Sequence, residues 1–80
     1  FNPITNIRYD IPEVSDVKID IYNLAGKKVK TLVSSNHQPG RYKIQWNATN
    51  ESGAPVSTGM YIYKIRAKDF VSVKKLLLMK

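Results

Sequence analysis

Alternation of apolar and polar residues is the feature that most constrains the fold of this 80-residue chain. In residues 17–22 (VKIDIY), Val17, Ile19 and Ile21 fall on one face of an extended strand. The same period of two recurs at residues 6–11, 41–46 and 61–67. This period is typical of half-buried antiparallel strands, whereas an amphipathic helix repeats its apolar residues about every three to four positions. The chain therefore predicts an all-β fold with little or no helix.

Turn-forming residues separate these segments and set the number of strands. Pro12 ends the first segment, Gly26 stands where a hairpin needs positive φ, and Pro39–Gly40 suits a type II turn. We expect strands near residues 5–11, 17–23, 27–33, 41–47, 55–57, 59–67 and 70–79. About seven short strands are typical of an immunoglobulin-like antiparallel β-sandwich, with Trp46 in its core. No internal repeat or linker interrupts the pattern, which predicts a single domain over residues 1–80.

Composition limits the chemistry that this domain can perform. Hydrophobic residues make up 42% and charged residues 24%, as in a globular protein, and cysteine is absent. The chain can therefore have no disulfide, thiolate nucleophile or cysteine-based metal site. The one histidine, His37, lies in a polar loop segment without an evident partner, and the acidic residues are scattered. We expect His37 to be a surface residue, and we predict no enzymatic activity, no cofactor and no metal site.

Net charge and apolar runs narrow the choice of partners. The charge of +7 favours anionic partners, but no helix-turn-helix, zinc-finger or RNA-recognition signature accompanies it, so we do not expect nucleic acid. The longest apolar run, residues 76–79, is far shorter than the roughly 18 residues of a membrane helix, which predicts no transmembrane segment. Because the first residue is Phe1 rather than Met, we expect a domain excised from a larger protein.

The last ten residues, VSVKKLLLMK, are unusual for a closing strand. One face of that strand would carry Val71, Val73, Lys75, Leu77 and Met79. The other face would carry Ser72, Lys74, Leu76, Leu78 and Lys80. Neither face is wholly polar, so the strand leaves apolar surface uncovered unless something packs on it. Such a strand could also pair two copies of the chain edge to edge.

Four parts of the sequence resemble a known family, and together they cover essentially the whole chain. They are the NP opening with IRY, the IYNLAGKKV hairpin, the segment from Trp46 to Tyr63 with the pattern W…G…V.TG.Y.Y, and the basic–aliphatic final strand. The chain resembles the type A C-terminal sorting domain of type IX secretion. It is also similar to the immunoglobulin-like domain of the flagellar hook-capping protein.

The resemblance to sorting domains implies a function in export. Such domains end proteins that bacteria secrete across the outer membrane, and the outer-membrane secretion machinery recognises the folded domain. A sortase-like protease often removes it, and the cargo stays on the cell surface or is attached to anionic lipopolysaccharide. The protein would therefore pass the periplasm and be secreted or surface-bound. The family's recognition element is the last strand, which carries over here to Lys74, Lys75, Leu76, Leu77, Leu78, Met79 and Lys80.

Two further groups of residues bear on partners. A basic surface that could face lipopolysaccharide, or be a solvated sheet face, would consist of Lys27, Lys28, Lys30, Lys64 and Arg66. In the family, the loop after the tryptophan often carries aspartates, where this chain has Asn47 and Asn50. Asparagine can form an Asx-type turn but is a poorer ligand for a hard cation, so we predict no calcium in this loop.

Two other functions stay open at this point. The first is a structural spacer or assembly domain of the hook-capping type, which the second resemblance favours. The second is a carbohydrate-binding module, which needs a row of exposed aromatic side chains. Tyr22 is the clearest aromatic residue at an outward position of the alternating pattern.

Overall fold

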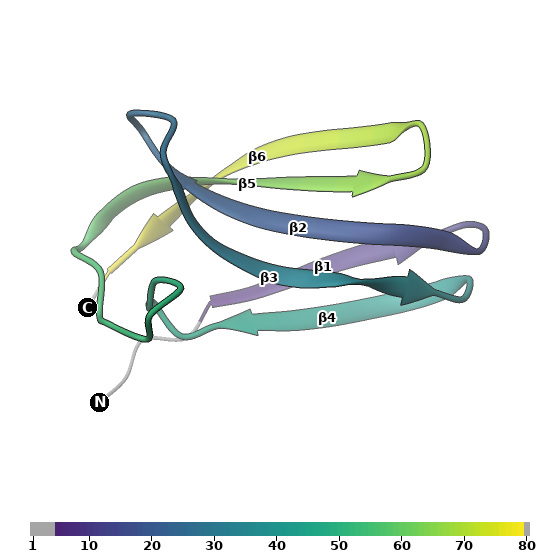
Figure 1. Cartoon of the computed structure of the whole chain (residues 1–80), viewed down its shortest axis with the longest axis horizontal. Helices are drawn as coiled ribbons and strands as arrows, with labels where there is room; N and C mark the ends of the chain where they lie inside the picture. Colours follow the sequence, from purple (N-terminus) through teal and green to yellow (C-terminus); the bar gives the residue numbers. More distant parts are fainter. Residues whose placement is uncertain (1–4, 80) are drawn as a thin grey trace.

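The computed structural model describes residues 5–79 and folds them into six antiparallel β-strands, with no helix in this range (Figure 1). The strands are β1 (Thr5–Ile11), β2 (Ser15–Asn23), β3 (Lys28–His37), β4 (Gly40–Trp46), β5 (Gly59–Ala67) and β6 (Phe70–Leu78). The all-β prediction is confirmed. The expected strand at 55–57 does not form, since this segment contributes only an isolated bridge between Pro55 and Thr49. Accordingly, no described helix is long and apolar enough to cross a membrane.

The strands form two sheets that face each other as a sandwich. One sheet has four strands in the order β3-β2-β5-β6, and the other has two strands, β1-β4 (Figure 1). β1 pairs with β4 over its whole length, from Thr5 opposite Trp46 to Ile11 opposite Gly40. Because the second sheet is narrower, it does not cover the whole inner face of the first. This mismatch leaves β6 at an open side of the sandwich.

The core lies between the sheets and contains Trp46, as predicted. The indole is fully buried, and its Nε1 donates a hydrogen bond to the Thr49 carbonyl at 2.9 Å. The ring of Tyr61 meets it edge-on, with centroids 5.2 Å apart. Apolar residues from both sheets complete this cluster, among them Ile7 from β1 and Leu78 from β6. The indole N–H is therefore satisfied inside the fold, as a buried donor requires.

Turns and bulges adapt the alternating strands to this core. Gly26 has φ of +85° in the β2–β3 hairpin, which confirms the prediction there. Gly40 has φ of +158°, far from the value near +80° that a type II turn needs, so the turn predicted at Pro39–Gly40 is wrong. The pairing of β2 with β3 shifts twice, which leaves Val29 and Leu32 as extra residues on β3. Both bulged residues pack against the core.

Candidate recognition surface on the outer face of the four-stranded sheet

The terminal strand β6 presents two different faces. Leu76 and Leu78 point inward and join the core around Trp46, and Leu78 is only 1% exposed. Leu77 points outward between them and is 56% exposed, and Met79 beyond the strand is 67% exposed. This arrangement explains the mixed sequence of the strand, since the inner leucines anchor it while the outer apolar residues stay accessible.

Cross-strand pairing places the outward residues of β6 beside those of β5. Leu77 lies opposite Met60, Lys75 opposite Ile62, Val73 opposite Lys64, and Val71 opposite Arg66. The neighbouring β2 continues these rows with outward residues Lys18, Asp20 and Tyr22. We call this surface of β2, β5 and β6, together with Lys28 and Thr31 of β3, the outer face. It combines an apolar stripe along β6 with basic side chains along β5 and β2.

Asp20 is the electrostatic centre of the outer face. Asp20 is only 5% exposed, and its carboxylate accepts a 2.7 Å hydrogen bond from the Thr31 hydroxyl. The Nζ atoms of Lys28 and Lys18 lie 3.9 and 4.0 Å from its carboxylate oxygens. Lys64 stands directly opposite on β5. The carboxylate thus holds several cations on one patch of sheet, where they would otherwise repel each other.

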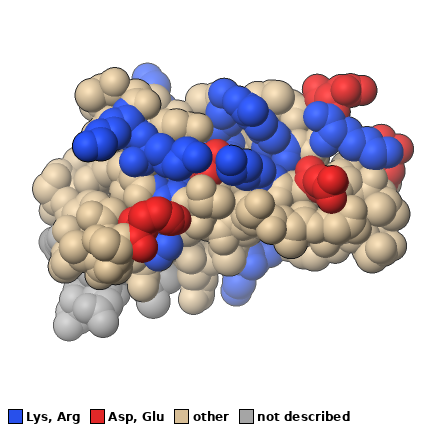
Figure 2. All heavy atoms as spheres, viewed as in Figure 1, with Lys and Arg blue, Asp and Glu red and all other residues tan. Residues whose placement is uncertain are grey.

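Basic side chains outnumber carboxylates on the outer face. Figure 2 shows Lys and Arg gathered across the upper half of the molecule, the part that the four-stranded sheet occupies in Figure 1. Asp16 adds a second carboxylate at the end of β2, where its Oδ1 accepts a hydrogen bond from the Asn36 amide. The apolar stripe of β6 therefore borders a surface of net positive charge, and this combination favours a partner that is both apolar and acidic.

The structure brings together some of the residues that the sequence analysis chose and separates others. Six of them share the outer face, namely Lys28, Lys64, Arg66, Lys75, Leu77 and Met79. Leu76 and Leu78 belong to the core, and Lys74 lines a groove on the inner side of β6. Lys27 is exposed beside the β2–β3 turn, and the Nζ of Lys30 donates a hydrogen bond to the Thr49 hydroxyl at 3.1 Å. Lys80 lies outside the described residues.

Other residues of the outer face were not predicted from the sequence as site residues. Val71 and Val73 belong to the same stripe as Leu77, and the alternation of the final strand could have included them. The alternation of residues 17–22 also puts Lys18 and Asp20 at outward positions. That an outward aspartate would be almost fully covered had no signal in the sequence, because its neighbours come from other strands.

The loop after Trp46 is held by Asn50. Its side-chain oxygen accepts hydrogen bonds from the backbone N–H groups of Ser52 and Ala54, at 3.1 and 3.0 Å, and from the Ser52 hydroxyl at 2.8 Å. The predicted Asx-type turn is therefore confirmed. The same amide oxygen is fully engaged by the loop's own donors.

His37 is a half-buried contact residue at the end of β3 rather than a free surface residue. Its Nε2 lies 2.8 Å from the Tyr9 hydroxyl, and its Nδ1 lies 3.2 Å from the carbonyl of Ser35. The ring of Tyr42 packs on both, with centroids 4.5 Å from His37 and 5.5 Å from Tyr9. Burial, and secondly the neighbouring Tyr42, raises the pKa of the Tyr9 hydroxyl above its usual value. This cluster joins the two sheets and explains the histidine structurally.

Comparison with known families places the fold. The family described as the FlgD Ig-like domain matches residues 4–69. The chain belongs to the FlgD Ig-like domain family. Among curated proteins, no sequence matches the chain. The match to the FlgD family ends at Asp69, the residue before β6, so the family description does not extend to the strand that carries the apolar stripe.

Two solved structures share the fold of this FlgD Ig-like domain. One is FlgD from P. aeruginosa, with a TM-score of 0.74 and 18% identity, covering 94% of this chain and 61% of that chain. The other is dimeric latent PorU from Porphyromonas gingivalis, with a TM-score of 0.66 and 15% identity, covering 99% of this chain and 8% of that chain. The domain therefore spans less than two thirds of FlgD and a small part of PorU. At such identities, these likenesses establish the fold.

Proposed function

We propose that this FlgD Ig-like domain is a non-catalytic sorting and anchoring module, recognised by the type IX secretion machinery during export of a larger protein across the outer membrane. The observation that carries the proposal is the outer face of β6. Its apolar side chains stay exposed while the opposite face of the same strand anchors it in the core. The resemblance of the whole sequence to type IX sorting domains supports the same conclusion.

The apolar stripe supplies the energy for such recognition. Full burial of a valine, leucine or methionine side chain is worth roughly 1.5–3 kcal/mol. Val71, Val73, Leu77 and Met79 each expose more than half of their surface. Covering each of them would therefore contribute roughly 1 kcal/mol before the costs of association. The lysines and Arg66 beside the stripe would speed the encounter with an acidic partner.

The position of the fold in other proteins supports a modular function. The same fold makes up only 8% of the PorU chain, so it occurs as a small part of a long protein. In our proposal the domain likewise follows a larger cargo, which reaches the periplasm, then the cell surface or the medium. Removal of the domain by a sortase-like protease and contact with anionic lipopolysaccharide belong to the same proposal.

A secretion assay tests the proposal. An export signal and a fluorescent reporter are fused to residues 1–80 and expressed in a bacterium with type IX secretion. The test variant changes three outward residues, Lys75→Gln, Leu77→Thr and Met79→Gln. Deleting the strand would be uninformative, because it would remove Leu76 and Leu78 from the core. The control variant, Val14→Thr with Leu24→Thr, changes exposed apolar residues outside β5 and β6.

The expected result is export of the parent and the control, with retention of the outer-face variant in the periplasm. A strain without the secretion pore should retain all of them. Circular dichroism of the purified domains establishes that each variant is folded. Export of a folded outer-face variant at the parental level would contradict recognition at this surface. Retention of the parent fusion in a competent strain would contradict the sorting function itself.

The family membership favours a second candidate, a structural or assembly domain of the hook-capping type. In that case the outer face would pack against a neighbouring subunit or domain, and the fusion would not leave the periplasm. The sequence of the parent protein distinguishes the two, since a secreted hydrolase or adhesin before Phe1 supports sorting and a flagellar protein supports assembly. For a carbohydrate-binding module, residues 5–79 offer no row of exposed aromatic side chains, because Tyr22 is half-buried and Phe70 stands alone in being mainly exposed.

A further inference from the structure

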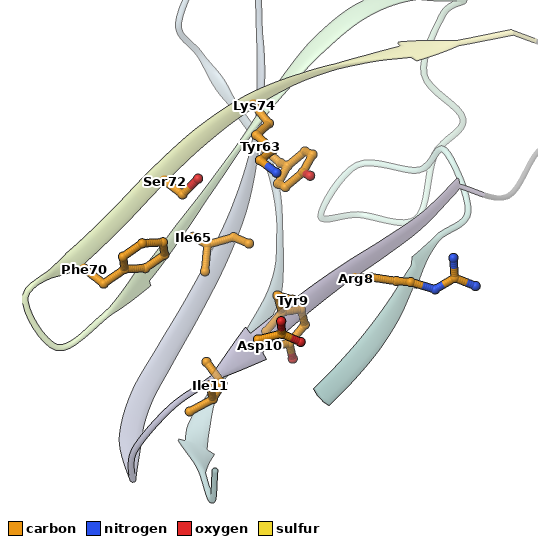
Figure 3. A pocket seen from close by; sticks show the side chains of 9 residues that line it. All are labelled: Arg8, Tyr9, Asp10, Ile11, Tyr63, Ile65, Phe70, Ser72 and Lys74. Carbon is orange, nitrogen blue, oxygen red and sulfur yellow. The ribbon is translucent and has the colours of Figure 1, made fainter. Parts of the chain in front are cut away.

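A groove of about 340 Å³ lies between β1 and the β5–β6 hairpin (Figure 3). One side is formed by residues 8–11 of β1, and the other by Phe70, Ser72 and Lys74 of β6. Tyr63 and Ile65 of β5 lie on its inner side. The groove is the place where the two-stranded sheet leaves the four-stranded sheet uncovered. A second hollow of about 450 Å³ shares Asp10 and Phe70 with it and extends it past the hairpin turn.

The backbone of β1 borders this groove with an unpaired edge. All seven residues of β1 are in strand conformation. Within residues 5–79, β1 pairs with β4 on one side and has no partner strand on the other. Alternate residues of a strand direct their N–H and C=O groups to the same side, so two of the four β1 residues that line the groove offer both groups to it. Such an edge is a template for another strand. We propose that the groove binds an extended peptide segment of another protein, which adds as a strand to the free edge of β1.

Side chains on the hairpin side of the groove supply apolar contacts for that strand. Phe70 is 58% exposed, and Figure 3 shows its ring and the side chain of Ile65 directed from the hairpin toward the space beside β1. Alternate side chains of an added strand stand roughly 7 Å apart on one face. One apolar side chain would contact Phe70 and the next would contact Tyr63 and Ile65. The opposite face of the added strand would stay in water and can be polar.

The two ends of the groove carry side chains of opposite charge. Lys74 and Arg8 lie toward one end, and no carboxylate of residues 5–79 forms a salt bridge with either. Asp10 and Asp69 lie toward the other end, near Phe70, and take part in no salt bridge within the same residues. An antiparallel partner would therefore carry a basic residue near its amino end and an acidic residue near its carboxyl end. This complementarity identifies the occupant as an amphipathic strand with opposite charges at its ends.

A matched pair of peptides tests the proposal with the full 80-residue chain. The probe is acetyl-Lys-Val-Thr-Val-Thr-Glu-amide, and the control is acetyl-Glu-Val-Thr-Val-Thr-Lys-amide. Titration is followed by the amide chemical shifts of the ¹⁵N-labelled domain. We expect the probe to shift the amides of β1 and of residues 70–74, and to bind about fivefold more tightly than the control, since an exposed ion pair is worth up to about fivefold.

Two variants separate the groove from the outer face. Phe70→Thr should weaken binding of the probe about tenfold, because it removes the exposed ring. Val73→Thr changes an equally exposed residue of the same strand on the outer face and should leave binding unchanged. A third variant, Lys74→Glu, tests the charges and should reduce the preference for the probe toward equal affinity, because Arg8 and Glu at position 74 then cancel at that end while Asp10 and Asp69 still attract the lysine of the probe. A loss of fold would weaken both peptides alike, whereas Lys74→Glu should weaken the probe and tighten the control peptide.

Several results would overturn the proposal. One is a probe that causes no shifts, or shifts confined to the outer face. Another is an unchanged preference in Lys74→Glu. If the β1 and β6 amides instead shift with protein concentration and ignore the peptides, a second copy of the chain covers the groove, and the proposed partner is wrong.

Discussion

Replacing Leu78 and Leu77 one at a time tests how the terminal strand is anchored. Leu78 is 1% exposed and packs with Trp46, Ile7 and Tyr61, whereas Leu77 is 56% exposed on the outer face. A buried Leu→Ala change costs about 2–5 kcal/mol, depending on how far the surroundings collapse. Leu78 is the last residue of β6, so its neighbours can relax in part, and we expect a loss near the middle of this range, about 3 kcal/mol. The free energy of unfolding should fall by less than about 0.5 kcal/mol in Leu77→Ala.

Urea denaturation followed by Trp46 fluorescence measures both changes. A domain of this size unfolds with an m-value of roughly 1 kcal/mol/M, so Leu78→Ala should lower the midpoint by about 3 M. An 80-residue domain has a total stability of roughly 4–12 kcal/mol, so this variant keeps only part of it. Equal losses for the two variants, or a larger loss for Leu77→Ala, would refute the assignment of the inner and outer faces of β6.

Three further variants test individual contacts of the fold. Asp20→Ala should lower the unfolding free energy by about 1–3 kcal/mol, because it leaves the Thr31 hydroxyl without its acceptor and removes the charge between the lysines. The Tyr9 pKa is raised in the fold, so the unfolded state loses this proton first and stability should decline as pH rises above 10.0; Tyr9→Phe should lack this decline and also lose the 2.8 Å contact with His37. Lys68→Gly should stabilise the domain by about 1 kcal/mol, since Lys68 has φ of +53° in the β5–β6 turn.

Each of these expectations has a result that contradicts it. For Asp20→Ala, screening in high salt should reduce the repulsion between the lysines and restore part of the lost unfolding free energy. A loss that is the same at low and high salt would contradict the effect of the Asp20 charge on the lysines. An alkaline decline that persists unchanged in Tyr9→Phe would assign it to other groups. A destabilised Lys68→Gly would mean that the flexibility gained in the unfolded chain outweighs the relief of the left-handed conformation.

The sequence predicted most of the fold because its signals are local. The alternation around Ile19 and the turn at Gly26 depend on neighbours along the chain. The two strands on either side of Gly26, β2 and β3, and the hairpin between them are present as expected. The sequence predicts a strand at residues 55–57, but in the structure Pro55 forms only an isolated bridge with Thr49. Pro39–Gly40 has the composition of a type II turn, but Gly40 enters β4 with φ of +158°. In both places the pairing of the neighbouring strands determined the conformation.

The candidate site was only partly predictable for the same reason. The sequence singled out the final strand as a whole, and both of its faces mix lysine with apolar residues. Composition therefore could not say that Leu78 is anchored in the core while Leu77 faces outward. The basic residues of β2 and β3 were likewise chosen as a group, although Lys30 turns to Thr49 and Lys28 to Asp20.

The sequence by itself determined that this protein is built of strands, which residues of each strand share a face, and that one tryptophan belongs inside. Those properties follow from the backbone geometry of an extended chain, in which successive side chains must point to opposite sides. Only the tertiary structure decided which face is buried, where Val29 and Leu32 bulge, why Asp20 is covered, and that a groove opens beside β1. These depend on strands far apart in the sequence, because the pairing order β3-β2-β5-β6 and the narrower β1-β4 sheet fix which surfaces meet and which remain open.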